Sequence, residues 1–191
     1  MKHYNTNIAG LFFLKPQIFT DSRGYFFESF SQQKFNELVG QEIIFVQDNE
    51  SKSTYGVLRG LHFQKPPYCQ SKLVRVVKGA VLDVAVDIRK GSPTFGQYEA
   101  VELNEENKLQ FFIPRGFAHG FVVLSPEVIF QYKCDNYYNP ESEDGVRFDD
   151  PEIGIDWKIE KKELILSDKD KNAPLLKDAY LFDYNENLYY I

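Results

Sequence analysis

The sequence has few cysteines and histidines and no long hydrophobic run. Its 191 residues include two cysteines, Cys69 and Cys134, which form no Cys-x-x-Cys pair. No apolar run approaches the roughly 20 residues needed to span a bilayer, and no secretory signal precedes the cysteines. We therefore expect reduced thiols without a chemical role, in a cytoplasmic protein that does not enter a membrane.

An excess of positive charge is also absent. The net charge is −6 and the isoelectric point is near 5.2, which argues against a dominant nucleic-acid or membrane-surface role. A small anionic ligand stays compatible, because a few clustered Arg and Lys side chains bind one locally. Aromatic residues are abundant, with 17 Phe and 12 Tyr. They support a large apolar core, and the chain length suits a single domain over 1–191.

Short segments with alternating apolar residues dominate the chain. In the segment 81–88, Leu82, Val84 and Val86 share one face of an expected strand, while Asp83 lies on the other. Comparable strands are expected at 42–47, 72–78, 97–103, 109–114, 120–124 and 128–134, with Gly and Pro between them. Many short strands at near-even spacing indicate a sandwich, jelly roll or barrel.

One helix is expected within this β pattern. Ser31 can cap it, Phe35, Leu38 and Val39 give an apolar stripe at helical spacing, and Gly40 can end it. The acidic stretch 139–150 is interpreted as a loop. The end of the chain is rich in Tyr, Phe and Leu, so we expect the segment of about 172–191 to pack on the body or on a second subunit.

The three histidines differ in context. His3 lies in an N-terminal stretch that we expect to be mobile, and it is interpreted as solvated. His62 ends a strand-like run, and His119 follows a turn. One histidine beside Phe is as readily a core residue as a functional one, but two flanked by Arg and Gly favour function. The His-x-His pattern followed by Glu of β-barrel metal sites is missing, so a catalytic metal is disfavoured.

Proton transfer without a cofactor is the second hypothesis. It needs a base, an acid on the other face of the substrate, and a cation to hold developing negative charge. His62 can supply the base, one of several tyrosines the acid, and Lys72 or Arg59 the cation. Arg precedes Gly at Arg23, Arg59 and Arg115, which fits either phosphate capture or ordinary turns with solvent-facing Arg.

Five motifs, in order and spacing, resemble one family. They are FTDSRGYFFESF (19–30), QDNESKS (47–53), the segment 57–96 that opens with VLRGLHFQKPPYCQSKLVRVVKG, FIPRGFAHGFVVLS (112–125) and ILSDKD (165–170). They are similar to the motifs of dTDP-4-dehydrorhamnose 3,5-epimerases over about residues 8–172. The resemblance implies a mainly β, double-stranded β-helix or jelly-roll (cupin) barrel with a few short helices. It also implies a homodimeric isomerase of dTDP-L-rhamnose synthesis, without a cofactor, acting on dTDP-4-dehydro-6-deoxy-D-glucose at carbons 3 and 5.

The resemblance also implies roles for single residues. His62 resembles the base, Asp170 its orienting partner, Tyr132 the opposing acid, and Lys72 the cation beside the keto oxygen. The matching substrate-binding positions are Arg23, Glu28, Gln47, Asn49, Arg59, His119, Tyr138, Glu143 and Lys169, with Tyr138 stacking on thymine and with Arg23 and Glu28 supplied by the partner subunit. Cys69 stands where such sequences often carry Ala, and the tail after Lys171 is not matched.

Three other functions stay open from the sequence. A related enzyme that inverts only carbon 3 or only carbon 5 would carry the same motifs. A sugar-nucleotide-binding cupin without activity is a second alternative, although a pure binder has no need for both an acid and a base. A metal-dependent cupin dioxygenase or isomerase is the third.

Overall fold

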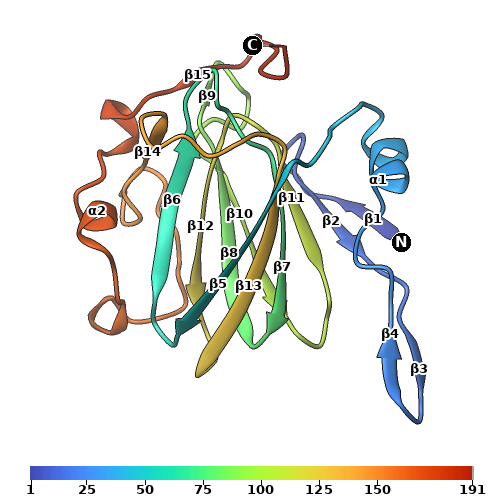
Figure 1. Cartoon of the computed structure of the whole chain (residues 1–191). Coiled ribbons are helices and arrows are strands. Elements are labelled where there is room, and N and C mark those ends of the chain that lie inside the picture. Colours follow the sequence, from blue (N-terminus) through green and yellow to red (C-terminus); the bar gives the residue numbers. More distant parts are fainter. Residues whose placement is uncertain (191) are drawn as a thin grey trace.

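Two antiparallel β-sheets face each other in the computed structural model, which describes residues 1–190 (Figure 1). The first sheet has the strand order β1-β2-β11-β7-β13-β5, with β1 Lys2–Asn5, β2 Phe12–Lys15, β11 Gln110–Ile113, β7 Lys72–Lys78, β13 Glu127–Cys134 and β5 Gln47–Thr54. The second has the order β10-β8-β12-β6-β14, with β10 Tyr98–Asn104, β8 Ala80–Asp87, β12 Phe117–Val123, β6 Leu58–Gln64 and β14 Glu143–Gly145. This sandwich confirms the predicted mainly β, jelly-roll architecture.

Two small ladders and a few helical turns complete the described chain. A hairpin is formed by β3 (Phe19–Asp21) and β4 (Gly24–Phe26), and β9 (Arg89–Lys90) pairs in parallel with β15 (Phe182–Asp183). The helices are α1 (Gln32–Val39) and α2 (Asp168–Lys171), with 3₁₀ turns at Lys161–Glu163 and Leu176–Asp178. Within residues 1–190, no helix is long and apolar enough to cross a membrane.

Three apolar clusters fill the layers. The central cluster lies between the sheets and includes Val74, Phe121 and Phe130. A second covers the other face of the five-stranded sheet, where residues from the C-terminal third pack on it, and a third lies between α1 and the six-stranded sheet. Strand β8 is buried along nearly its whole length, because its two faces belong to different clusters. Apolar residues therefore occupy both faces of β8.

The predicted helix is confirmed, and the strand predicted at 42–47 is wrong over residues 42–46, because β5 begins only at Gln47. Ser31 caps α1 and Gly40 ends it in the left-handed conformation. The segment before β5 does not join a sheet, because the Gln32 side chain donates to the carbonyl of Ile43 and accepts from the amide of Phe45, at 2.5 and 3.3 Å. These bonds tie residues 43–45 to the helix. Pairing with β13 starts only at the end of the segment, where the Val46 amide donates to the carbonyl of Cys134 at 2.9 Å.

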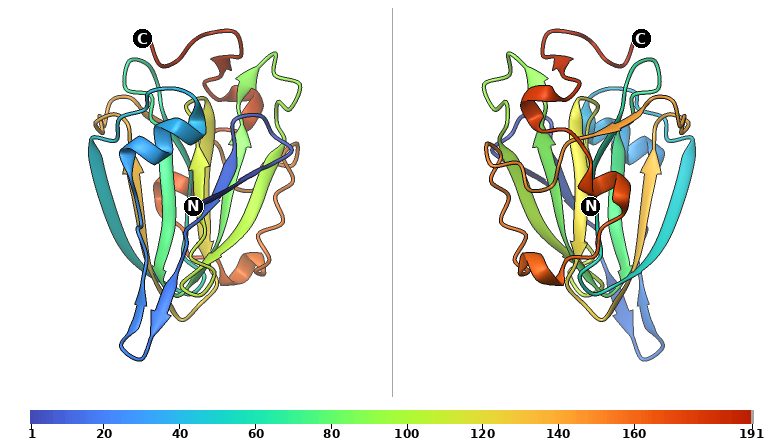
Figure 2. Two further views of the ribbon diagram at one scale, coloured as in Figure 1. Left: turned by 90° about the vertical axis from the view of Figure 1, so that its right-hand side faces the viewer. Right: turned by 90° about the vertical axis from the view of Figure 1, so that its left-hand side faces the viewer.

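Two smaller expectations also change. His3 does not lie in a solvated tail: it is half-buried in β1, and its ring meets Phe12 edge-on at 4.7 Å. The stretch 139–150 is mostly loop but contains β14, which pairs with β6. The β3–β4 hairpin extends away from the sandwich at the end opposite the C-terminus (Figures 1 and 2).

Candidate active site

The inter-sheet space changes from apolar to polar along its strands. On β13 the inward positions run from Val128 and Phe130 to Tyr132, and on β7 they run toward Lys72. Side chains at every second position share a face, so alternation alone puts each series inside. Two cavities open at the polar end, with volumes of about 310 and 570 Å³. Both are lined by His62, Lys72 and Tyr132.

A bulge in β6 places two of the expected site residues on one face of the strand. Arg59 pairs with Phe121 and His62 with His119, so three steps on β6 match two steps on β12. One extra residue in β6 restores both side chains to the cleft, although strict alternation would separate them. Gly60 permits this, because it has φ +125° and its missing Cβ would lie 2.5 Å from the Cα of Gly120.

His62 is paired with a carboxylate. Its Nε2–H donates to Oδ1 of Asp170 at 2.5 Å, and Ser167 Oγ donates to Oδ2 of Asp170 at 2.8 Å. Ser167 also caps α2 and so fixes the position of Asp170. Burial raises the pKa of Asp170, but the hydrogen bonds from His62 and Ser167 hold that pKa below its ordinary value overall. A carboxylate on Nε2 leaves Nδ1 of the imidazole as the free basic atom.

Tyr132 and Lys72 reach the cavity from the opposite sheet. Burial, and to a lesser extent Cys134, raises the pKa of Tyr132 to about 12, so its phenol stays protonated at neutral pH. The Lys72 ammonium lies 5.9 Å from the centre of the Tyr132 ring. Burial lowers the pKa of Lys72, while Cys134, Asp83 and Glu143 act in the other direction. Among residues 1–190 no group accepts a hydrogen bond from this ammonium, which leaves it available to a ligand.

A second histidine–carboxylate pair was missed at the sequence level. His119 Nε2 lies 3.0 Å from both carboxylate oxygens of Asp83, and both residues are buried. Burial lowers the pKa of His119, and the carboxylate of Asp83 opposes this. The signal was an Asp inside the apolar run VLDVAVD, on the face that turns toward the other sheet. A buried unpaired carboxylate is costly, so a partner was to be expected.

The rim of the cleft carries several of the expected binding residues. Tyr138 donates to Glu143 at 2.7 Å, Lys169 pairs with the same carboxylate at 2.5 Å, and Gln47 accepts from the Tyr138 amide at 3.0 Å. Asn49 accepts from the Gln47 side chain. The Tyr138 ring is half exposed and available for stacking.

Arg59 is oriented by one hydrogen bond. Its Nε donates to Ser53 Oγ at 3.1 Å, and the side chain lines the larger of the two cavities. Among residues 1–190, this is the hydrogen bond that the Arg59 guanidinium makes, and it uses Nε rather than the terminal nitrogens.

Two expected binding residues do not reach this cleft. Arg23 lies on the β3–β4 hairpin, where it pairs with Asp21, and 87% of its side chain is exposed. Glu28 follows the hairpin and pairs with Lys34 at 2.8 Å. Neither lines either cavity of the cleft, which is the arrangement expected if the partner subunit supplies them.

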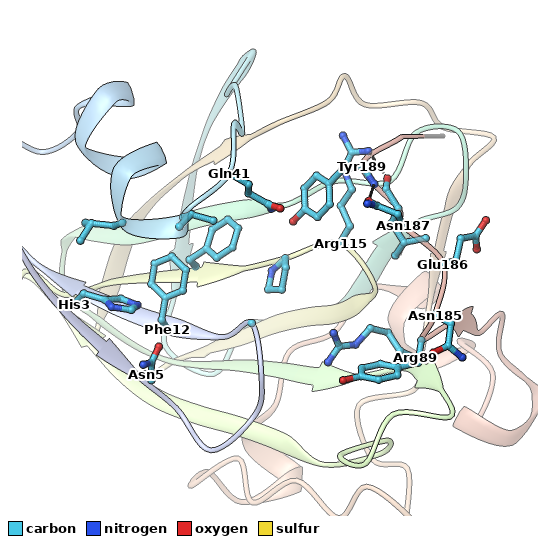
Figure 3. A pocket seen from close by; sticks show the side chains of 17 residues that line it. His3, Asn5, Phe12, Gln41, Arg89, Arg115, Asn185, Glu186, Asn187 and Tyr189 are labelled. Atoms are coloured by element: carbon cyan, nitrogen blue, oxygen red, sulfur yellow. Dashed lines mark hydrogen bonds between the residues drawn. The ribbon is translucent and has the colours of Figure 1, made fainter.

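A separate cavity of about 570 Å³ lies between the N-terminal strands and the C-terminal segment (Figure 3). Its two arginines are already neutralised, Arg89 by Asp87 and Arg115 by Asp135. It therefore offers no free positive charge to an anion. Across residues 1–190, no group of three or more His, Cys, Asp or Glu side chains is placed to hold a metal ion.

Comparison with known proteins gives a consistent result. The profile of the dTDP-4-dehydrorhamnose 3,5-epimerase family matches residues 5–178. The dTDP-4-dehydrorhamnose 3,5-epimerase of Shigella flexneri is 52% identical over 182 residues, covering 95% of this chain and 99% of that protein.

Two solved structures are also similar. The dTDP-6-deoxy-D-glucose-3,5-epimerase of Legionella pneumophila, in complex with dTDP-4-keto-L-rhamnose, superposes with a TM-score of 0.93 at 50% identity, over 97% of this chain and 99% of that chain. A 3′-monoepimerase from Streptomyces bikiniensis, in complex with dTDP-quinovose, has a TM-score of 0.85 at 36% identity, over 91% and 87%.

Proposed function

The chain belongs to the dTDP-4-dehydrorhamnose 3,5-epimerase family and is an isomerase, and from this we propose how its residues act. The substrate is dTDP-4-dehydro-6-deoxy-D-glucose, and the product is dTDP-4-dehydro-L-rhamnose. Inversion occurs at carbons 3 and 5 without a cofactor. The observation that supports this best is the convergence of His62 and Tyr132 on the same cavities from opposite sheets, with Lys72 beside them.

Both inverted carbons flank the carbon-4 ketone, so the proton on each is more acidic than an ordinary carbon-bound proton. His62 takes the proton through Nδ1 and becomes an imidazolium, which the Asp170 carboxylate stabilises. The electron pair moves to the keto oxygen as an enolate. Lys72 interacts more strongly with the enolate than with the ketone, and so lowers the barrier.

Inversion requires that the new proton arrive from the other face. Tyr132 donates its phenolic proton there, and the resulting phenolate recovers a proton from solvent. The imidazolium of His62 returns its proton to solvent as well, so each inversion exchanges one carbon-bound hydrogen. General acid–base groups of this kind contribute about 10²–10⁴-fold each.

The remaining cleft residues bind the nucleotide and the sugar in this proposal. Arg59 meets a phosphate, Tyr138 stacks on thymine, and His119 contacts the sugar. Their positions in the rim and wall of the cleft support these roles. Further contacts are assigned to Gln47, Asn49, Glu143 and Lys169.

Solvent exchange tests the proposed base. In D₂O, the parent enzyme should exchange the substrate protons at carbons 3 and 5, as followed by proton NMR. His62→Ala should abolish exchange at both carbons, while His3→Ala, a histidine on β1 outside both cavities of the cleft, should behave as the parent. Substantial exchange by His62→Ala would remove His62 as the base.

A single-centre epimerase is the second candidate, because the Streptomyces bikiniensis 3′-monoepimerase shares the fold. The two functions differ in their products. Proton NMR of the product, formed with and without a 4-keto reductase that traps it, shows whether carbon 5 inverts. Exchange and inversion at carbon 3 alone would establish the single-centre reaction.

We propose that the enzyme is a homodimer whose hairpins complete the partner's sites. Phe19, Tyr25 and Phe26 on the hairpin are 55%, 59% and 72% exposed, which is unusual for aromatic side chains on a free surface. Covering them with a second copy would bring Arg23 to a cleft from outside.

Mixing two inactive variants tests the shared site. Arg23→Ala lacks the donated arginine and His62→Ala lacks the base, so a mixed dimer has one complete site. After subunit exchange at equal amounts, half of the dimers are mixed, and about a quarter of the parent activity should return. Sedimentation of a monomer, or no gain on mixing, would contradict the proposal.

We also propose that residues 1–191 form one domain, with the segment from about 172 packed on the body. Leu176, Phe182 and Leu188 join the cluster on the five-stranded sheet, which supports this. We also propose a cytoplasmic location, because the two buried cysteines are free thiols, as is usual in a reducing compartment. Limited proteolysis that releases the tail rapidly would argue against the packing.

A further inference from the structure

The C-terminal segment closes a ring of polar contacts behind the cleft. Asp135 accepts from the Ser71 amide at 2.6 Å and from Arg115 Nε at 3.0 Å. Arg115 Nη1 then donates to the carbonyl of Leu188 at 2.7 Å, and the Tyr189 hydroxyl meets Ser71 Oγ at 2.8 Å. The Arg115 guanidinium also lies 5.0 Å from the centre of the Tyr189 ring (Figure 3).

The three ring residues that come from the sandwich, Ser71, Arg115 and Asp135, each lie just outside the end of a strand. Lys72 begins β7, and its strand partners are Ile113 on β11 and Cys134 on β13. Ser71 directly precedes Lys72 and Asp135 directly follows Cys134. Arg115 stands two residues after Ile113. The ring therefore joins the ends of three neighbouring strands at the level of the cleft cation, and the tail supplies the fourth side.

The ring is buried, so its bonds hold position strongly. Ser71 is fully buried, and the side chains of Arg115 and Asp135 are 9% and 3% exposed. Burial raises the pKa of Asp135, and the Arg115 guanidinium opposes this. In such surroundings, a hydrogen bond removed from one partner leaves the other unsatisfied.

The tail itself is anchored before it reaches the ring. β15 pairs with β9, and the Tyr184 amide donates a hydrogen bond to the backbone carbonyl of Lys90 at 3.1 Å. Leu188 is buried near Gly116. Tyr189 is thus presented to Ser71 by a docked segment rather than by a free end.

We propose that the C-terminal segment 183–190 is a positioning element for Lys72, and that the Tyr189 hydroxyl is its contact to the catalytic strand. This rests on the proposed function, in which Lys72 holds the enolate. Ser71 directly precedes Lys72, the first residue of β7, so the two residues share a peptide bond. A shift of Ser71 toward the position left by the hydroxyl would move the Lys72 ammonium relative to the keto oxygen.

Tyr189→Phe tests the inference with the smallest change, because the ring over Arg115 remains. We expect kcat to fall about 3- to 10-fold, since one positioning hydrogen bond is lost. The affinity for dTDP, measured by calorimetry, should be unchanged, because Lys72 contacts the sugar and not the nucleotide. Tyr190→Phe is the matched control, since this neighbouring ring is 89% exposed, and it should behave as the parent.

If Tyr189 positions Lys72, Tyr189→Phe lowers kcat and leaves dTDP affinity unchanged. If Tyr189 only supports folding, both quantities fall together. Unchanged kcat in Tyr189→Phe would overturn the inference, and so would equal losses of kcat, dTDP affinity and melting temperature. In a Lys72→Met background, Tyr189→Phe should cause no further loss of exchange, and a full additional loss there would also overturn it. Exchange by the parent is measured first, so failure of the epimerase assignment is recognised separately.

Discussion

Replacement of Asp170 by Asn isolates the charge that supports the proposed base. The substitution keeps an oxygen that can accept from His62 Nε2 at the observed 2.5 Å position, so the ring orientation is preserved. It removes the negative charge that stabilises the imidazolium formed on proton abstraction. The side chains are 28% and 5% exposed for His62 and Asp170, so water screens the pair only partly.

The magnitude follows from the charge interaction. Two unit charges about 4 Å apart interact by about 4 kcal/mol at an effective dielectric constant of about 20. A remaining neutral hydrogen bond recovers about 1 kcal/mol. The transition state should therefore lose about 3 kcal/mol, which corresponds to about 10²-fold in rate.

Solvent exchange in D₂O is again the assay, now as an initial rate at saturating substrate. Ser167→Ala is the control: it removes one hydrogen bond from Asp170 but keeps the charge, and should cost only about tenfold or less. An Asp170→Asn rate within about twofold of the parent would refute the reasoning, because no charge effect would then reach the base.

The same pair gives a stability prediction. The native pKa of Asp170 lies below its ordinary value of 3.8, so the carboxylate stabilises the fold fully above that value. The contribution is lost as the pH falls through the native pKa. The difference in melting temperature between the parent and Asp170→Asn should narrow in that acid range, as measured by calorimetry. A difference that stays constant would contradict the linkage.

Three further substitutions extend the test. Tyr132→Phe should impair inversion at carbon 5 more than proton removal at carbon 3, and full double epimerisation by this variant would exclude Tyr132 as the acid. Because the pKa of Tyr132 is about 12, the parent enzyme should lose no activity through ionisation of this phenol up to about pH 10. Lys72→Met should lower kcat by about 10²-fold or more with dTDP affinity retained, as judged by kinetics and calorimetry. Gly60→Ala should destabilise the fold by about 2–4 kcal/mol in chemical denaturation, because its Cβ would lie 2.5 Å from Gly120; a change under about 0.5 kcal/mol would show that the bulge relaxes.

Local sequence patterns determined the elements with short-range causes. Ser31, the apolar stripe of Phe35 and its neighbours, and Gly40 specify α1 without outside help, and the alternation in 81–88 places its two faces correctly. The strand predicted at 42–47 failed over 42–46 because Ile43 and Phe45 bond through their backbone to the Gln32 and Asn36 side chains of α1. A pattern of apolar residues does not record where hydrogen bonds are made.

The family resemblance supplied the site residues, but only the fold explains their convergence. Alternation would have put Arg59 and His62 on opposite faces of β6, and one extra residue opposite β12 brings them to the same cleft. The fold also shows the partner of Asp83, because antiparallel pairing of β8 with β12 places its carboxylate beside His119. The sequence by itself determined periodicity, caps and residue chemistry, because these depend on neighbours along the chain. Tertiary structure decided register, the bulge, and the docking of the tail on Ser71, because these depend on contacts between residues far apart in sequence.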